Sequence, residues 1–221
     1  MKFCSDLEAD FRKAFNRELA IPMENYMKNN FTYFGIKTEK RRTIFKSNYE
    51  QNKPEVESNF RTIAWKLYQM KEREFHQTAI DLLVKEFKKK YVLEDIRLIE
   101  KLIITNSWWD SVDTIAKYIL GGYLLQFPSE TLKVIERFSN SENMWLNRSA
   151  ILFQLSYKEK TDFEILKSEC EKHKDSNEFF IQKAIGWALR DYSRFNPKGV
   201  EVYVNSTNLK PLSEREALRL L

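Results

Sequence analysis

The sequence predicts an all-α protein, an α-solenoid of about six helix pairs that stack into a curved array with a concave basic face. Apolar residues recur at steps of three and four over most of the chain, as they do on one face of a helix. Five glycines and five prolines in 221 residues are too few for the tight turns of a many-stranded β protein. A motif also returns with a period in the mid-thirties, the spacing of two-helix solenoid repeats.

Individual helices are expected between recognisable breaks. The steps from Ile63 to Leu67 and from Ile80 to Leu83 predict two helices in the first half of the chain. Expected stops are Lys53–Pro54, Gly121–Gly122, Phe127–Pro128, Asn196–Pro197 and Lys210–Pro211. Ser107 and Ser213 each stand three residues before an acid and predict capping boxes at two helix starts. No linker divides the chain, so residues 1–221 are expected to form one domain.

The repeat becomes visible when helix starts are aligned. Each copy begins with an aromatic residue, has a polar or basic residue three positions later, and then a small or β-branched residue. Copies occupy residues 75–79, 108–112, 145–149 and 180–184, with looser relatives at 39–43 and 212–216. The leading aromatic residues are 33, 37 and 35 residues apart. The position after the motif is apolar in three copies and Asp113 in the fourth. A carboxylate at such a position either finds a buried partner or lines a cleft.

Composition and charge narrow the range of functions. The net charge of +5 and pI near 9.0 favour a polyanionic partner such as nucleic acid, with a membrane surface or the ribosome as competing partners. No apolar run is long enough to cross a bilayer, and acids follow the N-terminus where a signal peptide would be apolar, so a cytoplasmic location is expected. Two scattered cysteines and two scattered histidines form no zinc motif. Asp110 and Asp113 lack a third carboxylate at suitable spacing, so no metal or cofactor is expected.

The segment around Asp113 carries the most information about chemistry. Trp109 and Asp113 are four residues apart, so both side chains lie on one face of a helix. Chemistry alone leaves two interpretations open. The pair either packs in the interior with an internal salt bridge, or it lines a cleft and meets a ligand.

Several segments resemble the AlkD-type DNA glycosylases, a family of HEAT-like-repeat proteins. The segments are SWWDSVD at 107–113, MWLNRSAIL at 144–152, the stretch 179–190, and two upstream stretches at 22–29 and 34–42. The likeness therefore runs over nearly the whole chain. The resemblance implies excision of cationic alkylated purines such as 3-methyladenine and 7-methylguanine from double-stranded DNA. It also implies recognition through sugar and backbone, with Asp113, Trp109 and Trp187 as the catalytic centre.

The same residues suit this chemistry on physical grounds. Loss of an alkylated purine leaves a neutral base and a sugar with positive charge, so negative potential beside the sugar accelerates the reaction. A carboxylate about 4 Å from that charge offers on the order of 4 kcal/mol, or about a thousandfold in rate, at an effective dielectric of about 20. Indole faces such as those of Trp109 and Trp187 add cation–π attraction of about 0.5–2 kcal/mol each.

Basic residues at equivalent repeat positions are expected to follow the DNA backbone. Arg148 and Lys183 share one position of the motif, and Arg190 follows on the second of these helices. Such cations give affinity and register without sequence preference. Arg42 and Tyr26 lie in the upstream matched stretches and are further candidates for DNA contact. A solvated helix face, an internal ion pair, or for Tyr26 a place in the core, is the alternative for each.

Two other functions compete with the glycosylase. The first is a non-catalytic HEAT-like protein that binds DNA structure, because some relatives are thought to keep the fold and lose excision. A basic residue is common in relatives near Ser156, so one phosphate contact is expected to be missing here. The second is a protein-binding scaffold, the commonest use of α-solenoids. The chain is expected to act as a monomer in every case.

Overall fold

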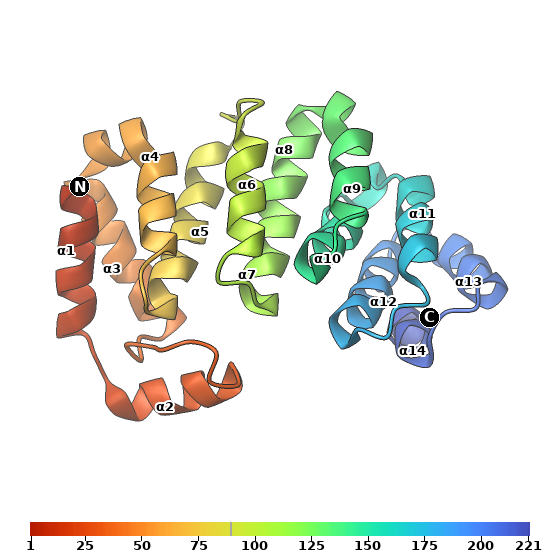
Figure 1. Cartoon of the computed structure of the whole chain (residues 1–221), viewed down its shortest axis with the longest axis horizontal. Coiled ribbons are helices and arrows are strands. Elements are labelled where there is room, and N and C mark those ends of the chain that lie inside the picture. The colour runs from red at the N-terminus through yellow and green to blue at the C-terminus, as the bar shows by residue number, and fades with distance from the viewer. Residues whose placement is uncertain (89) are drawn as a thin grey trace. The chain divides into compact units, whose positions relative to one another are not determined.

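The computed structural model describes residues 1–88 and 90–221, and it consists of two compact units, Met1–Lys90 and Tyr91–Leu221. The first unit holds α1 (Lys2–Lys13), α2 (Arg17–Tyr26), α3 (Thr38–Gln51), α4 (Lys53–Tyr68) and α5 (Arg73–Phe87) (Figure 1). Apart from an isolated bridge between Thr32 and Glu72, regular structure in the described residues is helical. The predicted all-α class is therefore confirmed.

The second unit begins with α6 (Asp95–Ile104), followed by α7 (Trp109–Thr114), a π-helical turn (Ile115–Leu120) and α8 (Gly121–Gln126). It continues with α9 (Thr131–Ser139), α10 (Met144–Leu152), α11 (Phe163–His173), α12 (Phe179–Ser193), α13 (Pro197–Ser206) and α14 (Pro211–Ala217). Short 3-10 turns occupy Pro128–Glu130, Lys158–Lys160 and Leu218–Leu220. Within this unit α10 packs against the π turn, α9, α11 and α12, while α12 packs most extensively against α14.

Proline marks the expected helix boundaries. Pro54, Pro128, Pro197 and Pro211 each stand in the first turn of a helix, where the missing N–H group costs nothing. Asn196 caps α13 by accepting a hydrogen bond from the Gly199 amide at 3.0 Å. These four predicted boundaries are confirmed.

The expected stop at Gly121–Gly122 is wrong, because residues 109–126 form one continuous helical rod. Both glycines serve close packing. A Cβ atom on Gly121 would lie 2.5 Å from the carbonyl oxygen of Phe153, and one on Gly122 would lie 2.6 Å from the hydroxyl of Tyr91. Glycine lets these neighbours approach the rod more closely than any larger residue allows.

Both expected capping boxes are also wrong. The helix after Ser107 begins at Trp109, and the Ser107 hydroxyl donates to the Ile103 carbonyl at 2.6 Å. Ser213 lies inside α14, where its hydroxyl donates to the Gln182 carbonyl at 3.0 Å. Each serine hydroxyl donates to a carbonyl of another helix and does not cap the backbone amides at the start of its own helix.

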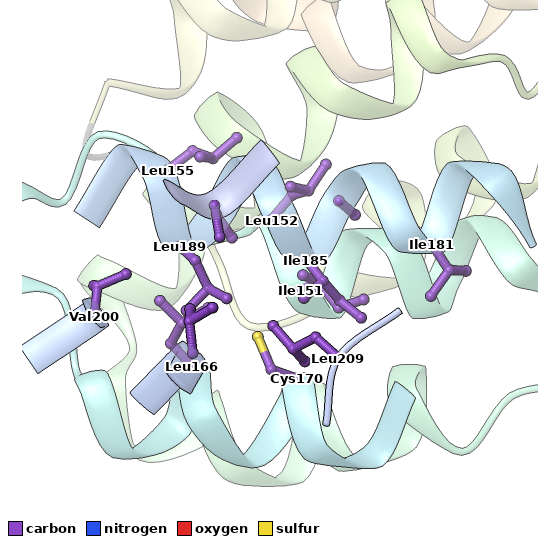
Figure 2. Packing of buried hydrophobic residues seen from close by; sticks show 14 of the residues in the cluster. Ile151, Leu152, Leu155, Leu166, Cys170, Ile181, Ile185, Leu189, Val200 and Leu209 are labelled. Carbon is purple, nitrogen blue, oxygen red and sulfur yellow. The ribbon is translucent and has the colours of Figure 1, made fainter. Parts of the chain in front are cut away.

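The core of the second unit joins α10, α11, α12 and α13. Figure 2 shows the side chains that meet there, which include Ile151, Leu152, Leu166, Cys170, Ile185, Leu189 and Val200. Their spacing on each helix follows the three- and four-residue steps of the sequence, so each helix turns one apolar stripe inward. Trp187 packs partly buried against this cluster.

Candidate functional site

Equivalent positions of the repeat meet in the second unit. The rings of Trp108, Trp145 and Phe180 lie against one another, with centroids 5.1 to 5.9 Å apart in every pair. These are the leading aromatic residues of three successive motifs, so the alignment drawn from the sequence matches real contacts. Phe75, their counterpart in the first unit, packs on Phe11 at 5.3 Å. The aromatic cluster fixes the spacing between the starts of α7, α10 and α12.

Asp113 lies beside this cluster on α7, one turn after Trp109. Its carboxylate receives two hydrogen bonds from Arg148 of α10, from Nε to Oδ1 at 2.7 Å and from Nη2 to Oδ2 at 2.8 Å. The Arg148 side chain is 5% exposed and the Asp113 side chain 13% exposed. The structure thus shows the internal salt bridge, one of the two alternatives, with a small part of the Asp113 side chain still exposed.

Arg148 connects three helices of successive repeats. Besides the pair with Asp113, its Nη1 donates to the backbone carbonyl of Phe180 in the first turn of α12. Its guanidinium carbon lies 5.9 Å from the centre of the Phe180 ring. The sequence predicts Arg148 to be an accessible cation beside the duplex. The structure instead buries it in an internal ion pair, because Asp113 and the Phe180 carbonyl together match its planar fork of donors.

The electrostatic state of Asp113 results from two opposed effects. Burial raises the pKa of Asp113 above its ordinary value because the charged form loses solvation. The hydrogen bonds and positive charge of Arg148 oppose this rise, whereas the charge of Asp110 adds to it. The site therefore holds a carboxylate whose charge depends on its arginine partner.

Trp109 and Trp187 are both half-buried, on α7 and α12 respectively. Trp109 begins the helix that carries Asp113, following an extended backbone at Trp108. Trp187 lies between Lys183 and Arg190 in the sequence of α12. Neither residue is fully buried.

Lys183 and Arg190 both pair with Glu216 of α14. The Lys183 Nζ atom lies 3.0 Å from Oε1 and the Arg190 Nη1 atom lies 2.7 Å from Oε2. Sequence reasoning expected these two cations and missed the acid that joins them. Glu216 had a usable signal, because it falls in the loose sixth copy of the repeat, where other copies hold a small or β-branched residue.

Arg42 and Tyr26 belong to the first unit. Arg42 makes two hydrogen bonds to Asp81 of α5, both at 3.1 Å, and its side chain remains 62% exposed. Neighbouring Arg41 is buried against the same Asp81 at 2.8 Å. Tyr26 ends α2 with an exposed side chain and is not a core residue. Arg42 and Tyr26 thus both present surface to solvent.

The described residues contain no group of three or more histidine, cysteine or acidic side chains arranged to hold a metal ion. In the same part of the chain, no helix combines the length and apolar character needed to cross a membrane.

Comparisons with known proteins place the chain in a family. Residues 7–221 match the family described as DNA alkylation repair enzyme. A solved structure described as a predicted DNA alkylation repair enzyme from Enterococcus faecalis shares 34% identity, with a TM-score of 0.86 over 94% of this chain and 96% of that one. A comparison with curated proteins gives no match.

Two more distant structures share the fold. The protein smu.31 from Streptococcus mutans UA159 is 18% identical, with a TM-score of 0.58 over 82% of this chain and 90% of that one. AlkD2 from Streptococcus mutans is 17% identical, with a TM-score of 0.59 over 84% of this chain and 88% of that one. The predicted helical-repeat fold is confirmed, and the chain belongs to the family of DNA alkylation repair enzymes.

Proposed function

We propose that this protein is a DNA glycosylase that hydrolyses the N-glycosidic bond of cationic alkylated purines in double-stranded DNA. The expected substrates are 3-methyladenine and 7-methylguanine. The observation that carries the proposal is the Asp113 carboxylate, which is held by Arg148 and remains partly accessible. We expect the protein to act as a cytoplasmic monomer without metal or cofactor, and its excess of basic residues to favour binding of the duplex.

The reaction needs a negative charge beside the sugar. The bond between C1′ and the base nitrogen breaks, its electron pair leaves with the base, and the alkylated base departs neutral. A water oxygen then bonds to C1′ and loses its proton to Asp113. The carboxylate stabilises the positive sugar in the transition state, and Trp109 and Trp187 supply ring faces that attract positive charge and keep out bulk solvent.

In this proposal Arg148 sets the charge state of Asp113. In the DNA-free protein its hydrogen bonds oppose the effect of burial on Asp113 and so favour the ionised form. The charge that Asp113 keeps in this pair is the negative potential that the reaction uses at the sugar.

Release of methylpurine from methylated DNA tests the proposal. Asp113→Asn should lower kcat/KM by about a thousandfold, because the amide has the shape of the carboxylate without its charge. Glu100→Gln is the control, since Glu100 is an acid on α6 that pairs with an arginine, Arg137, outside the proposed site. Equal release by wild type and Asp113→Asn removes Asp113 from the mechanism. Binding of alkylated duplex with no product favours the non-catalytic alternative, and no binding at low salt favours a protein scaffold.

A further inference from the structure

Lys183 and Arg190 point in nearly the same direction from α12. They are seven residues apart, which is two helical turns and about 10 Å along the axis. Trp187 lies one turn from each of them, on the same broad face. The side chains of Lys183 and Arg190 are 36% and 21% exposed, so both cations can be reached from solvent. Two accessible cations on either side of an indole make a site for one anion.

Glu216 fills that site with a carboxylate from the same chain. Each of its oxygens takes one cation, Oε1 from Lys183 and Oε2 from Arg190, and its own side chain is only 11% exposed. The hydrogen bond from Lys183, followed by that from Arg190, holds the pKa of Glu216 below its ordinary value. A carboxylate bridging two cations resembles a phosphate group in charge and in its pair of acceptor oxygens.

The backbone of α14 fixes Glu216 in place. A Cβ atom on Gly186 would lie 2.5 Å from the Cβ of Glu216 and 2.8 Å from the carbonyl oxygen of Ser213. The two helices approach this closely because residue 186 has no side chain. Ser213 also bonds to the Gln182 carbonyl across the same interface. The acid is therefore held by its helix, whereas the long side chains of Lys183 and Arg190 can rotate toward another anion.

We propose that Glu216 is an affinity- and specificity-determining residue that occupies, in the DNA-free protein, the site that a DNA phosphate group takes between Lys183 and Arg190. The inference rests on the proposed function, because it requires DNA to reach the face of α12 that carries Trp187. A phosphate that binds there must draw Lys183 and Arg190 away from Glu216. Nonspecific contacts with the DNA backbone consequently contribute less binding free energy than Lys183 and Arg190 would contribute without Glu216.

This competition favours damaged over undamaged DNA. Phosphate groups are identical along a duplex, so backbone contacts by themselves bind every position alike. With Glu216 present, a phosphate at Lys183 and Arg190 adds little net free energy. Binding then depends more on contacts that undamaged DNA lacks, such as those of a cationic base or sugar with Asp113 and Trp187.

Binding of an undamaged, fluorescently labelled duplex tests the inference. Affinity is measured for wild type and Glu216→Gln as salt is raised from about 50 to about 200 mM. Glu216→Gln should bind on the order of tenfold more tightly at the lowest salt, because two part-exposed cations lose their competitor. The plot of log K against log salt should steepen by about 1 unit, since one neutralised phosphate contributes about 0.9.

Two further variants test whether the higher affinity of Glu216→Gln comes from the freed cations. Glu164→Gln is the charge-matched control, because Glu164 is an exposed acid on α11 paired with Lys167 at 2.8 Å. It raises the net charge equally and should change neither affinity nor slope by a comparable amount. Adding Lys183→Gln to Glu216→Gln should remove at least half of the gain. If Glu216→Gln does not fold, Glu216→Asp replaces it, because the shorter acid cannot reach both cations.

The outcomes separate this inference from the proposed function. If wild type releases methylpurine but Glu216→Gln binds undamaged duplex as Glu164→Gln does, Glu216 only joins α12 to α14 and the inference is wrong. If wild type neither binds duplex at low salt nor releases methylpurine, the proposed function and the inference are both wrong. The inference is supported if Glu216→Gln binds undamaged duplex more tightly and with a steeper salt dependence, and if adding Lys183→Gln reduces both effects.

Discussion

Asp113 and Arg148 form a bidentate ion pair between residues 35 positions apart, which is one repeat of the sequence. The pair closes one repeat onto the next and also sets the charge of the proposed catalytic carboxylate. Stability and chemistry are thus coupled at one contact, and each can be tested separately.

Loss of the arginine should destabilise the protein. Arg148→Gln leaves the Asp113 carboxylate largely buried without its cation, which should reduce the free energy of unfolding by about 3 kcal/mol or more at neutral pH. Urea denaturation measures the change. Adding Asp113→Asn should restore part of the loss because no buried charge remains. A double variant as unstable as the sum of the two single variants would show that the ion pair is not the cause.

The pH dependence of excision should report the charge of Asp113. The ionised form is the active one, so kcat/KM falls as pH drops through the pKa of Asp113, and burial places that fall above the ordinary value of 3.8. Arg148→Lys keeps a positive charge but loses the bidentate hydrogen bonds that lower this pKa, so the fall should move to higher pH. Arg137→Lys, which alters an arginine paired with Glu100, is the control and should leave its position unchanged. No difference between the two variants would contradict the assignment of this fall to Asp113.

Gly186→Ala should destabilise the protein by about 1–3 kcal/mol, because the added methyl group overlaps Glu216 and the α14 backbone. The sign is informative, since glycine to alanine inside a helix ordinarily stabilises by about 1 kcal/mol. Thermal unfolding measures the change. A more stable variant would mean that α14 is not packed tightly against α12.

Glu74 should hold the segment between α2 and α3. Its fully buried carboxylate accepts hydrogen bonds from the amides of Phe34 at 3.1 Å and Ile36 at 3.0 Å. Glu74→Gln replaces one acceptor by a donor that faces an N–H group, at a cost of about 1–3 kcal/mol. Hydrogen exchange at these two amides should accelerate. The exposed Glu50→Gln on α3 is the control, and equal exchange in both variants would exclude this role.

The sequence predicted the helical class, the proline boundaries and the alignment of the repeats. These features depend on the spacing of apolar residues and on the period of the aromatic residues, both of which can be read directly from the sequence. The prediction of a helix end at Gly121–Gly122 was wrong. In the sequence, a glycine that ends a helix cannot be told from a glycine inside a helix that lets another segment pack closely. Ser107 and Ser213 were misread for the same reason, since their acceptors come from other helices.

The sequence alone identified Asp113 as an acid at an otherwise apolar repeat position, and Arg148, Lys183 and Arg190 as candidate cations for DNA. Only the tertiary structure decided their partners, joining Arg148 to Asp113 and placing Glu216 between Lys183 and Arg190. The physical reason is that the strength of an ion pair depends on the distance between the charges and on their burial. Both quantities are set only when successive repeats pack together. A period in the sequence says which positions are equivalent, whereas the packing of helices determines which charges meet.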